Sequence, residues 1–317
     1  MLNLSHNYLH SVIKKYDGIA RGSSSLWGAR MTKAYGILSK GLDHHINDNI
    51  HFDYNHEQIS IARRLRIGYY ERLITIENII NNLQPWTSVV IDVEIFDSIF
   101  NDQDGNITMP DEDEDKKEEY NHSFTISGYD SHSNNFIVNS SGWNWWGKNG
   151  DGTMPLEYLQ KYLVEAYMTT GMPRLSSETR NSLLEKKIVL KNKKYYSNLF
   201  LESNFCCDKK QKLNSEIINN GGDLVGWAHF SFDNGNRIID MLDIFVLNEY
   251  RNNGIGSYII KEIMDFTKAK NLTGYISSYD LIQDREEIVK SFLLKNNLTV
   301  TVDRSQFKNC RLKILNI

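Results

Sequence analysis

The sequence is poor in cysteine and proline and contains no long apolar run. Its 317 residues include 3 cysteines and 4 prolines. The cysteines are too few for a disulfide framework and lack the Cys-x-x-Cys or Cys/His spacing of a zinc site, so we expect no metal. No stretch approaches the roughly 18 apolar residues of a transmembrane helix, and the first residues do not resemble a secretory signal. These absences predict a cytoplasmic protein with reduced thiols and no membrane partner.

The charge balance argues against a further class of function. The chain has 36 basic and 40 acidic residues and a net charge of −4. Because binding to nucleic acid requires a basic surface, we expect no nucleic-acid partner. The length predicts two globular domains of roughly 100–200 residues each. Composition leaves the oligomeric state open.

The periodicity of apolar residues in the first half predicts an α+β domain. Helices are expected over 26–40, 73–83 and 156–168, and strands over 88–93, 123–129 and 135–139. Glycine and proline in the segment 171–177 then interrupt the pattern. We therefore expect a domain over 1–172, a linker over 173–184 and a second domain over 185–317.

A glycine-containing segment in the second half predicts an anion site. Strands are expected over 224–232, 237–247 and 273–277, and helices over 255–270 and 285–295. Residues 250–257 read Tyr-Arg-Asn-Asn-Gly-Ile-Gly-Ser, directly after a strand and at the start of a helix. Glycine lets backbone N–H groups turn inward, and the helix N-terminus adds a partial positive charge. A diphosphate suits such a site.

This order of elements, with Arg-x-x-Gly-x-Gly before the helix, resembles the GNAT (general N-acetyltransferase) superfamily over roughly residues 185–317. The resemblance implies a mixed α/β domain that uses acetyl-CoA or another acyl-CoA as co-substrate. It also implies that the strand ending at Phe245 and Val246 pairs with the pantetheine arm of CoA. The residues implied to hold the CoA diphosphate are Arg251, Asn252, Asn253, Gly254, Ile255, Gly256 and Ser257.

Acyl transfer to an amine is assisted by a base and an acid. In this superfamily the base is often a carboxylate on the strand before the phosphate loop, which makes Asp240 and Asp243 the candidates. Three positions apart, they should lie on opposite faces of a regular strand, with Asp240 on the face of Val246. We slightly prefer Asp240. The usual acid is a tyrosine at a position occupied here by Leu293, and Tyr279 is the candidate substitute.

A second motif lies in the first half. His122 is expected at the start of a strand and Asn139 on the next one, before a segment rich in tryptophan and glycine. An imidazole with an orienting amide is part of a nucleophilic triad. The segment resembles the papain-like cysteine peptidases over roughly residues 1–172. The resemblance implies that His122 is the catalytic histidine, that Asn139 orients it, and that Trp143 or Trp145 shields the pair.

The peptidase nucleophile is missing. Aligning Trp27 with the Cys-Trp pair of that family places Leu26 at the nucleophile, and residues 1–201 contain no cysteine. A shift of one residue would offer the Ser25 hydroxyl, with His122 as its base. Our leading interpretation is an N-acyltransferase with an inactive papain-like domain that recognises a peptide, protein or amino-acid-like acceptor. The alternatives are a hydrolase or amidase that uses Ser25 and His122, and a non-catalytic module that binds CoA.

Overall fold

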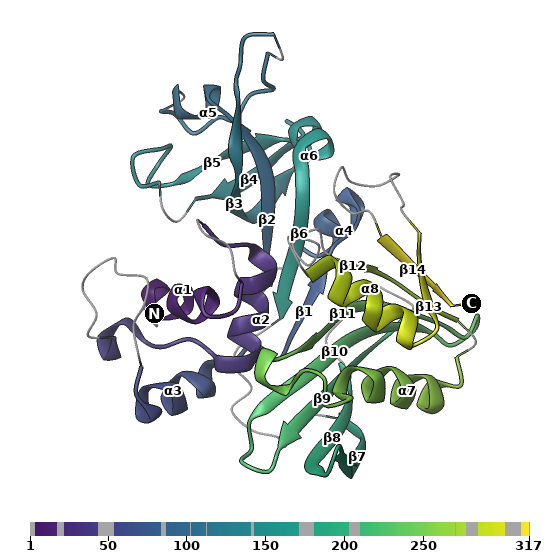
Figure 1. The fold of residues 1–317 in the computed structure, drawn as a ribbon. Helices are drawn as coiled ribbons and strands as arrows, with labels where there is room; N and C mark the ends of the chain where they lie inside the picture. The colour runs from purple at the N-terminus through teal and green to yellow at the C-terminus, as the bar shows by residue number, and fades with distance from the viewer. Residues whose placement is uncertain are drawn as a thin grey trace.

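The structure is a computed structural model of the chain. It describes residues 4–17, 22–43, 54–83, 87–101, 103–111, 113–140, 143–170, 181–202, 210–269, 271–276, 285–301 and 312–316. Two β-sheets dominate it, a six-stranded sheet in the first half of the chain and an eight-stranded sheet in the second half (Figure 1). The α+β fold class expected from the sequence is confirmed.

The first sheet is antiparallel throughout, with the strand order β1-β6-β2-β3-β4-β5. Its strands are β1 (Tyr69–Arg72), β2 (Thr87–Phe96), β3 (Lys117–Asp130), β4 (Asn135–Asn139), β5 (Asp151–Pro155) and β6 (Leu163–Thr170). Alternate residues of β2, such as Val89, Ile91 and Val93, are fully buried with Phe124 and Phe136 in one core. Alternation along β2 therefore directs its even-numbered side chains, Asp92 among them, to the opposite face.

The helices of this half are α1 (His6–Lys14), α2 (Ser25–Tyr35), α3 (His56–Ala62), α4 (Ile76–Asn81), α5 (Ser98–Asn101) and α6 (Leu156–Tyr162), with 3₁₀ turns at Lys40–Leu42 and Arg63–Leu65. Helix α2 begins where the Ser24 side chain accepts the N–H of Trp27, and it ends before Gly36. Gly36 has a φ of 74°, and an added Cβ would lie 1.9 Å from the Ala62 carbonyl oxygen. Only glycine fits there, so the end of α2 is set by close packing against α3.

One predicted helix is wrong in part. The segment 156–168 was expected to be helical, but α6 ends at Tyr162 and β6 follows from Leu163. Strand β6 lies between β1 and β2, and Val164, Ala166 and Met168 are at most 2% exposed. A short apolar run gives the same signal in a buried strand as in a buried helix. Pairing with two neighbouring strands decides the structure here.

The second sheet has the order β13-β14-β12-β11-β10-β9-β8-β7. Its strands are β7 (Asn181–Leu190), β8 (Lys193–Glu202), β9 (Gln211–Asn219), β10 (Leu224–Asp233), β11 (Ile238–Val246), β12 (Asn271–Ile276), β13 (Leu298–Thr301) and β14 (Leu312–Asn316). β11 and β12 are parallel, joined through helix α7 (Ile255–Thr267), and α8 (Arg285–Lys295) follows β12. β7 begins inside the expected linker 173–184, so the second sheet starts earlier in the chain than the sequence pattern indicated.

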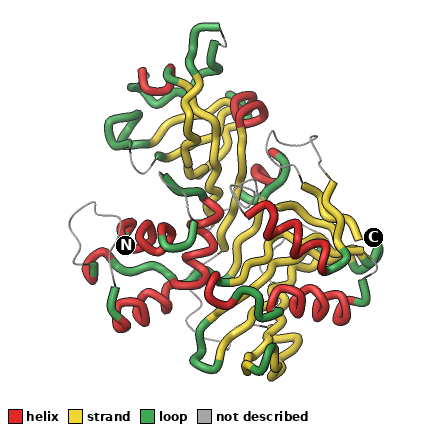
Figure 2. Tube along the Cα trace, viewed as in Figure 1, coloured by secondary structure: helices red, strands yellow, loops and turns green. Residues whose placement is uncertain are grey.

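The two faces of this sheet have different partners. Helices α7 and α8 cover one face, where Ile255, Ile259 and Ile263 of α7 are buried at helical spacing. The first half of the chain covers the other face, and Trp227 and Phe245 share a core cluster with Trp27 and other residues of that half. Figure 2 shows the helix α2 between the strand-rich halves. No described helix is long and apolar enough to cross a membrane.

Candidate functional site

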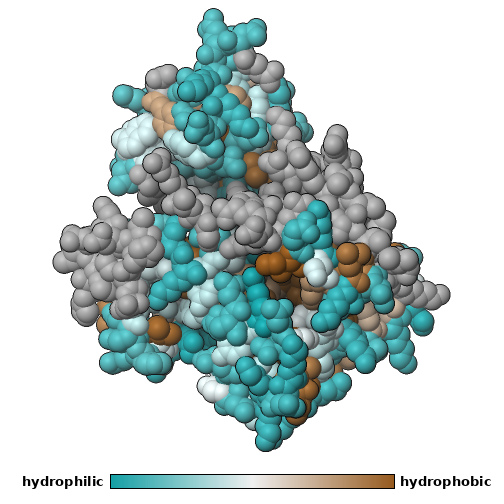
Figure 3. Space-filling view, viewed as in Figure 1, coloured by the Kyte–Doolittle hydropathy of each residue, from teal (hydrophilic) through white to brown (hydrophobic). Residues whose placement is uncertain are grey.

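A cavity of about 630 Å³ lies beside β11, the start of α7 and the helix α8. Its wall is mainly apolar and includes Ile244, Ile255 and Leu293. The charged residues of the wall include Arg251 from the loop before α7 and Arg30 from α2. Apolar side chains gather around a recess on the face that carries α8 (Figure 3). The cavity is thus built by both halves of the chain.

The cavity lies where β11 separates from β12. The parallel register runs from Ile238 opposite Asn271 to Met241 opposite Gly274, and no described strand pairs with this side of β11 beyond that point. The Leu247 N–H donates to the Val225 carbonyl, so alternation directs the backbone groups of Ile244 and Val246 away from β10. These groups form a strand edge in the cavity wall with which no described strand pairs, and the Val246 carbonyl there accepts a side-chain hydrogen bond from Arg251.

The loop before α7 presents a series of backbone amides. Asn252 and Gly254 have φ values of 61° and 85°, in the left-handed region that glycine and asparagine tolerate. After this loop, the first backbone N–H that donates to a backbone carbonyl is that of Tyr258, which donates to the Gly254 carbonyl. The amides from Asn252 to Ser257 donate to no described residue. Amides at the N-terminus of a helix are suited to an anion.

Side chains brace this loop. Arg251 Nε donates to the Val246 carbonyl at 3.1 Å, and its guanidinium lies 5.6 Å from the centre of the Phe245 ring. The Asn253 amide donates to the Tyr250 carbonyl at 3.0 Å. A Cβ on Gly256 would lie 2.8 Å from the Phe292 ring, so glycine permits α8 to approach the start of α7. The loop and the open edge of β11 are therefore held together.

A bulge in β11 changes the expected geometry of its carboxylates. Met241 pairs with Phe230 of β10 and Asp243 pairs with His229, which leaves Leu242 as an extra residue. Asp240 pairs with Ser231, so Asp240 and Asp243 lie on the same face. The expectation that they lie on opposite faces, with Asp240 on the face of Val246, is wrong, because it assumed a regular strand.

The two carboxylates have different surroundings. Asp240 lies 2.7 Å from Lys210 Nζ, accepts from the Thr273 hydroxyl, and is not among the residues that line the cavity. Asp243 does line the cavity. Arg30 donates to it from Nε at 3.1 Å and from Nη2 at 2.6 Å, and the Tyr70 hydroxyl donates to it as well. Three hydrogen bonds, two from Arg30 and one from Tyr70, therefore hold this carboxylate in place.

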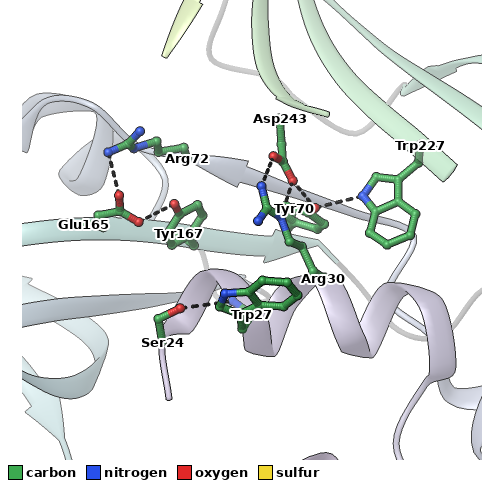
Figure 4. A network of polar contacts seen from close by, with 9 residues as sticks. All are labelled: Ser24, Trp27, Arg30, Tyr70, Arg72, Glu165, Tyr167, Trp227 and Asp243. Atoms are coloured by element: carbon green, nitrogen blue, oxygen red, sulfur yellow. Dashed lines mark hydrogen bonds and ion pairs between the residues drawn. The ribbon is translucent and has the colours of Figure 1, made fainter. Parts of the chain in front are cut away.

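Figure 4 shows this cluster, in which Arg30 extends from α2 towards Asp243 with Tyr70 beside them. The Tyr70 hydroxyl accepts from Trp227 Nε1 at 2.9 Å. Complete burial raises the pKa of Tyr70 well above its usual value, so it remains a donor. Sequence reasoning missed Arg30, because no spacing pattern links it to a residue 213 positions away.

In the first half, His122 lies on β3 and packs against Trp143. Its ring stacks on Trp143, with centroids 3.8 Å apart and planes inclined by 15°. Nε2 is 2.9 Å from the Ser140 hydroxyl, and burial lowers the pKa of His122 to about 4. The Asn139 amide instead donates to Asp151 at 2.8 Å. The structure therefore places Ser140, rather than the expected Asn139, against the imidazole.

Ser25 has a different partner. Its hydroxyl donates to Asp92 Oδ1 at 2.5 Å and its N–H donates to Oδ2 at 3.2 Å, while the Ser123 hydroxyl also donates to Asp92. Burial raises the pKa of Asp92. Asp92 pairs with Ser123 and Val93 pairs with His122, so alternation places His122 on the other face of the sheet. No hydrogen bond joins the two described side chains of Ser25 and His122.

Comparison with known proteins identifies the second half. A model of the Acetyltransferase (GNAT) family matches residues 179–283. The second half of this chain carries a GNAT domain. No curated protein matches the chain.

Solved structures are similar to each half. Xylellain, a cysteine protease from Xylella fastidiosa, has 18% identity and a TM-score of 0.46, over 53% of this chain and 70% of that chain. Nourseothricin acetyltransferase has 14% identity and a TM-score of 0.30, over 43% of this chain and 85% of that chain. PaiA N-acetyltransferase from Thermoplasma acidophilum, in complex with coenzyme A, has 16% identity and a TM-score of 0.26, over 33% of this chain and 60% of that chain.

The cavity in the GNAT domain brings together most of the residues expected to bind the cofactor. The expected residues that line it are Phe245, Val246, Arg251, Asn252, Gly254, Ile255, Gly256 and Ser257. Asn253 braces the loop behind it. Leu293 is buried in its wall, and Tyr279 lies outside the described residues. Within the described part of the chain, no cluster of His, Cys, Asp and Glu could hold a metal ion.

Proposed function

We propose that the GNAT domain transfers an acyl group from acetyl-CoA or another acyl-CoA to an amine. The observation that carries the proposal is the series of backbone amides from Asn252 to Ser257, which donate to no described residue and adjoin the open edge of β11. Amides at a helix N-terminus fit a diphosphate, and an open strand edge fits the amide groups of a pantetheine arm. The apolar wall fits the acyl end of such a co-substrate.

The transfer itself needs few protein groups. The amine nitrogen attacks the thioester carbonyl carbon, the carbon–sulfur bond breaks, and the thiolate takes up a proton while the new ammonium loses one. Because Asp243 is engaged and Asp240 lies away from the cavity lining, we propose that the acceptor proton leaves to water. Tyr279 stays our candidate for the proton donor.

The acceptor is proposed to be a peptide, a protein or an amino-acid-like molecule, recognised by the papain-like half. We retain the proposed division into residues 1–172 and 185–317 with a linker at 173–184, and the end of this linker includes the first residues of β7. The support is that α2, which begins where the peptidase nucleophile would lie, contributes Arg30 to the cavity wall. At a rise of about 1.5 Å per residue, Ser25 and Arg30 are only about 7.5 Å apart along the helix axis.

A matched pair of variants at Gly254 tests the proposal. Gly254 has a φ of 85° and an added Cβ would meet nothing within 4 Å. Asparagine and aspartate both tolerate this conformation and have similar shapes, but only aspartate adds a negative charge. We expect Gly254→Asn to retain most acetyl-CoA affinity in isothermal titration calorimetry and Gly254→Asp to lose it. Absence of binding to the unchanged protein, or equal affinities of the two variants, would refute the proposal.

A further inference from the structure

Two buried ion pairs join α2 to two different strands of the GNAT domain. Arg30 pairs with Asp243 of β11, and Lys33 pairs with Glu216 of β9 at 2.8 Å. Both basic side chains are 1% exposed, and they lie about one helical turn apart. Only the pair between Arg30 and Asp243 lines the cavity. The two pairs have similar burial and different positions, so one serves as a control for the other.

Asp243 is the first residue after the bulge, where β11 has left β12. From this residue to Val246, β11 has a described strand neighbour only on the β10 side. Arg30 contacts this segment at two residues. It donates to both carboxylate oxygens of Asp243, and its guanidinium lies 4.7 Å from the centre of the Phe245 ring. Tyr70 of β1 adds a third contact with Asp243. The first half of the chain therefore contacts, from one face of the sheet, the part of β11 that has no described neighbour on the β12 side.

We propose that Arg30 is a positioning residue for the acyl-transfer site. Its bidentate contact with Asp243 fixes the segment of β11 from Asp243 to Val246, which among the described strands pairs only with β10, so that the backbone edge at Ile244 and Val246 can pair with a pantetheine arm. This inference rests on the proposed function. A planar guanidinium bonded to both carboxylate oxygens restricts orientation more than a single contact does. If the strand edge is already ordered in the free protein, ligand binding does not have to order it, and this smaller loss of entropy raises the affinity.

The inference predicts different effects on the binding of the two parts of CoA, the pantetheine arm and the nucleotide. The amides of the loop from Asn252 to Ser257 follow the segment from Asp243 to Val246 in the chain, and they donate to no group of α2. Loss of the Arg30 contact should therefore weaken binding of the pantetheine part and spare the nucleotide part. A general loss of structure would weaken both, so the ratio of the two affinities distinguishes positioning from stability.

The experiment is titration calorimetry of the full chain with CoA and with adenosine 3′,5′-bisphosphate, which lacks the pantetheine arm. For Arg30→Met we expect about tenfold weaker binding of CoA, comparable with the loss of one or two net hydrogen bonds. Binding of the bisphosphate should change by less than about twofold, as expected for a site outside the perturbed contact. Lys33→Met, which removes the other buried pair, should leave the ratio of the two affinities unchanged.

Further variants keep the test decisive. The double variant Arg30→Met, Asp243→Leu removes both charges and so avoids an isolated buried charge. It should show the same selective loss, and Arg30→Lys should restore part of the CoA affinity. Equal CoA affinity of the unchanged protein and the Arg30 variants would overturn the inference. If the unchanged protein binds the bisphosphate but not CoA, or neither, the proposed function fails instead.

Discussion

Replacing Asp243 with asparagine separates two roles that a carboxylate in this cavity could have. If Asp243 were the general base, the variant would lose about 10²–10⁴-fold in kcat and keep its stability. If Asp243 is an anchor between the two halves, the variant loses stability. The structure favours the anchor, because Arg30 and Tyr70 together donate three hydrogen bonds to this one carboxylate.

The expected loss of stability in Asp243→Asn follows from the burial of the ion pair between Arg30 and Asp243. The Arg30 and Asp243 side chains are 1% and 10% exposed, and asparagine would remove the negative charge of Asp243 from beside the buried guanidinium. Breaking such a pair from one side typically costs about 3–5 kcal/mol. A matched control is Asp240→Asn, whose ion pair with Lys210 has side chains 31% and 39% exposed. An exposed pair of this kind contributes about 0–1 kcal/mol.

The assay is urea unfolding of both variants beside the unchanged protein, followed by initial rates of thiol release from acetyl-CoA. We expect Asp243→Asn to unfold at clearly lower urea concentration, and to show a raised KM for acetyl-CoA if Arg30 positions β11. Asp240→Asn should unfold close to the unchanged protein. A large fall in kcat for Asp243→Asn with an unchanged free energy of unfolding would refute the anchoring role.

Two further predictions concern the first half of the chain. Burial lowers the pKa of His122 from 6.5 to about 4, so this residue contributes stability that is fully present above pH 6.5 and is lost as the pH falls towards 4. NMR titration should find the ring neutral at pH 5, and a midpoint near 6.5 would contradict its burial. Ser25→Ala should cost about 1–3 kcal/mol in urea unfolding, because buried Asp92 loses a donor. We also expect no fluorophosphonate labelling of Ser25; labelling that Ser25→Ala abolishes would revive the hydrolase alternative.

The sequence alone predicted the local features of the GNAT domain. The helix α8 and the loop before α7 lie where expected. These features depend on short-range properties, such as positive φ at Gly254 and a change of apolar period between strand and helix. Such properties are set by neighbouring residues, so they can be read along the chain.

Only the tertiary structure decided which side chains meet. The bulge at Leu242 places Asp240 and Asp243 on one face, and pairing on both sides makes 163–170 a strand. Ser140, one position beyond the expected Asn139, contacts His122. Arg30 contacts Asp243 because α2 packs against the face of the second sheet opposite to α7 and α8. Contacts between distant segments follow from packing of the whole core, which no local spacing encodes.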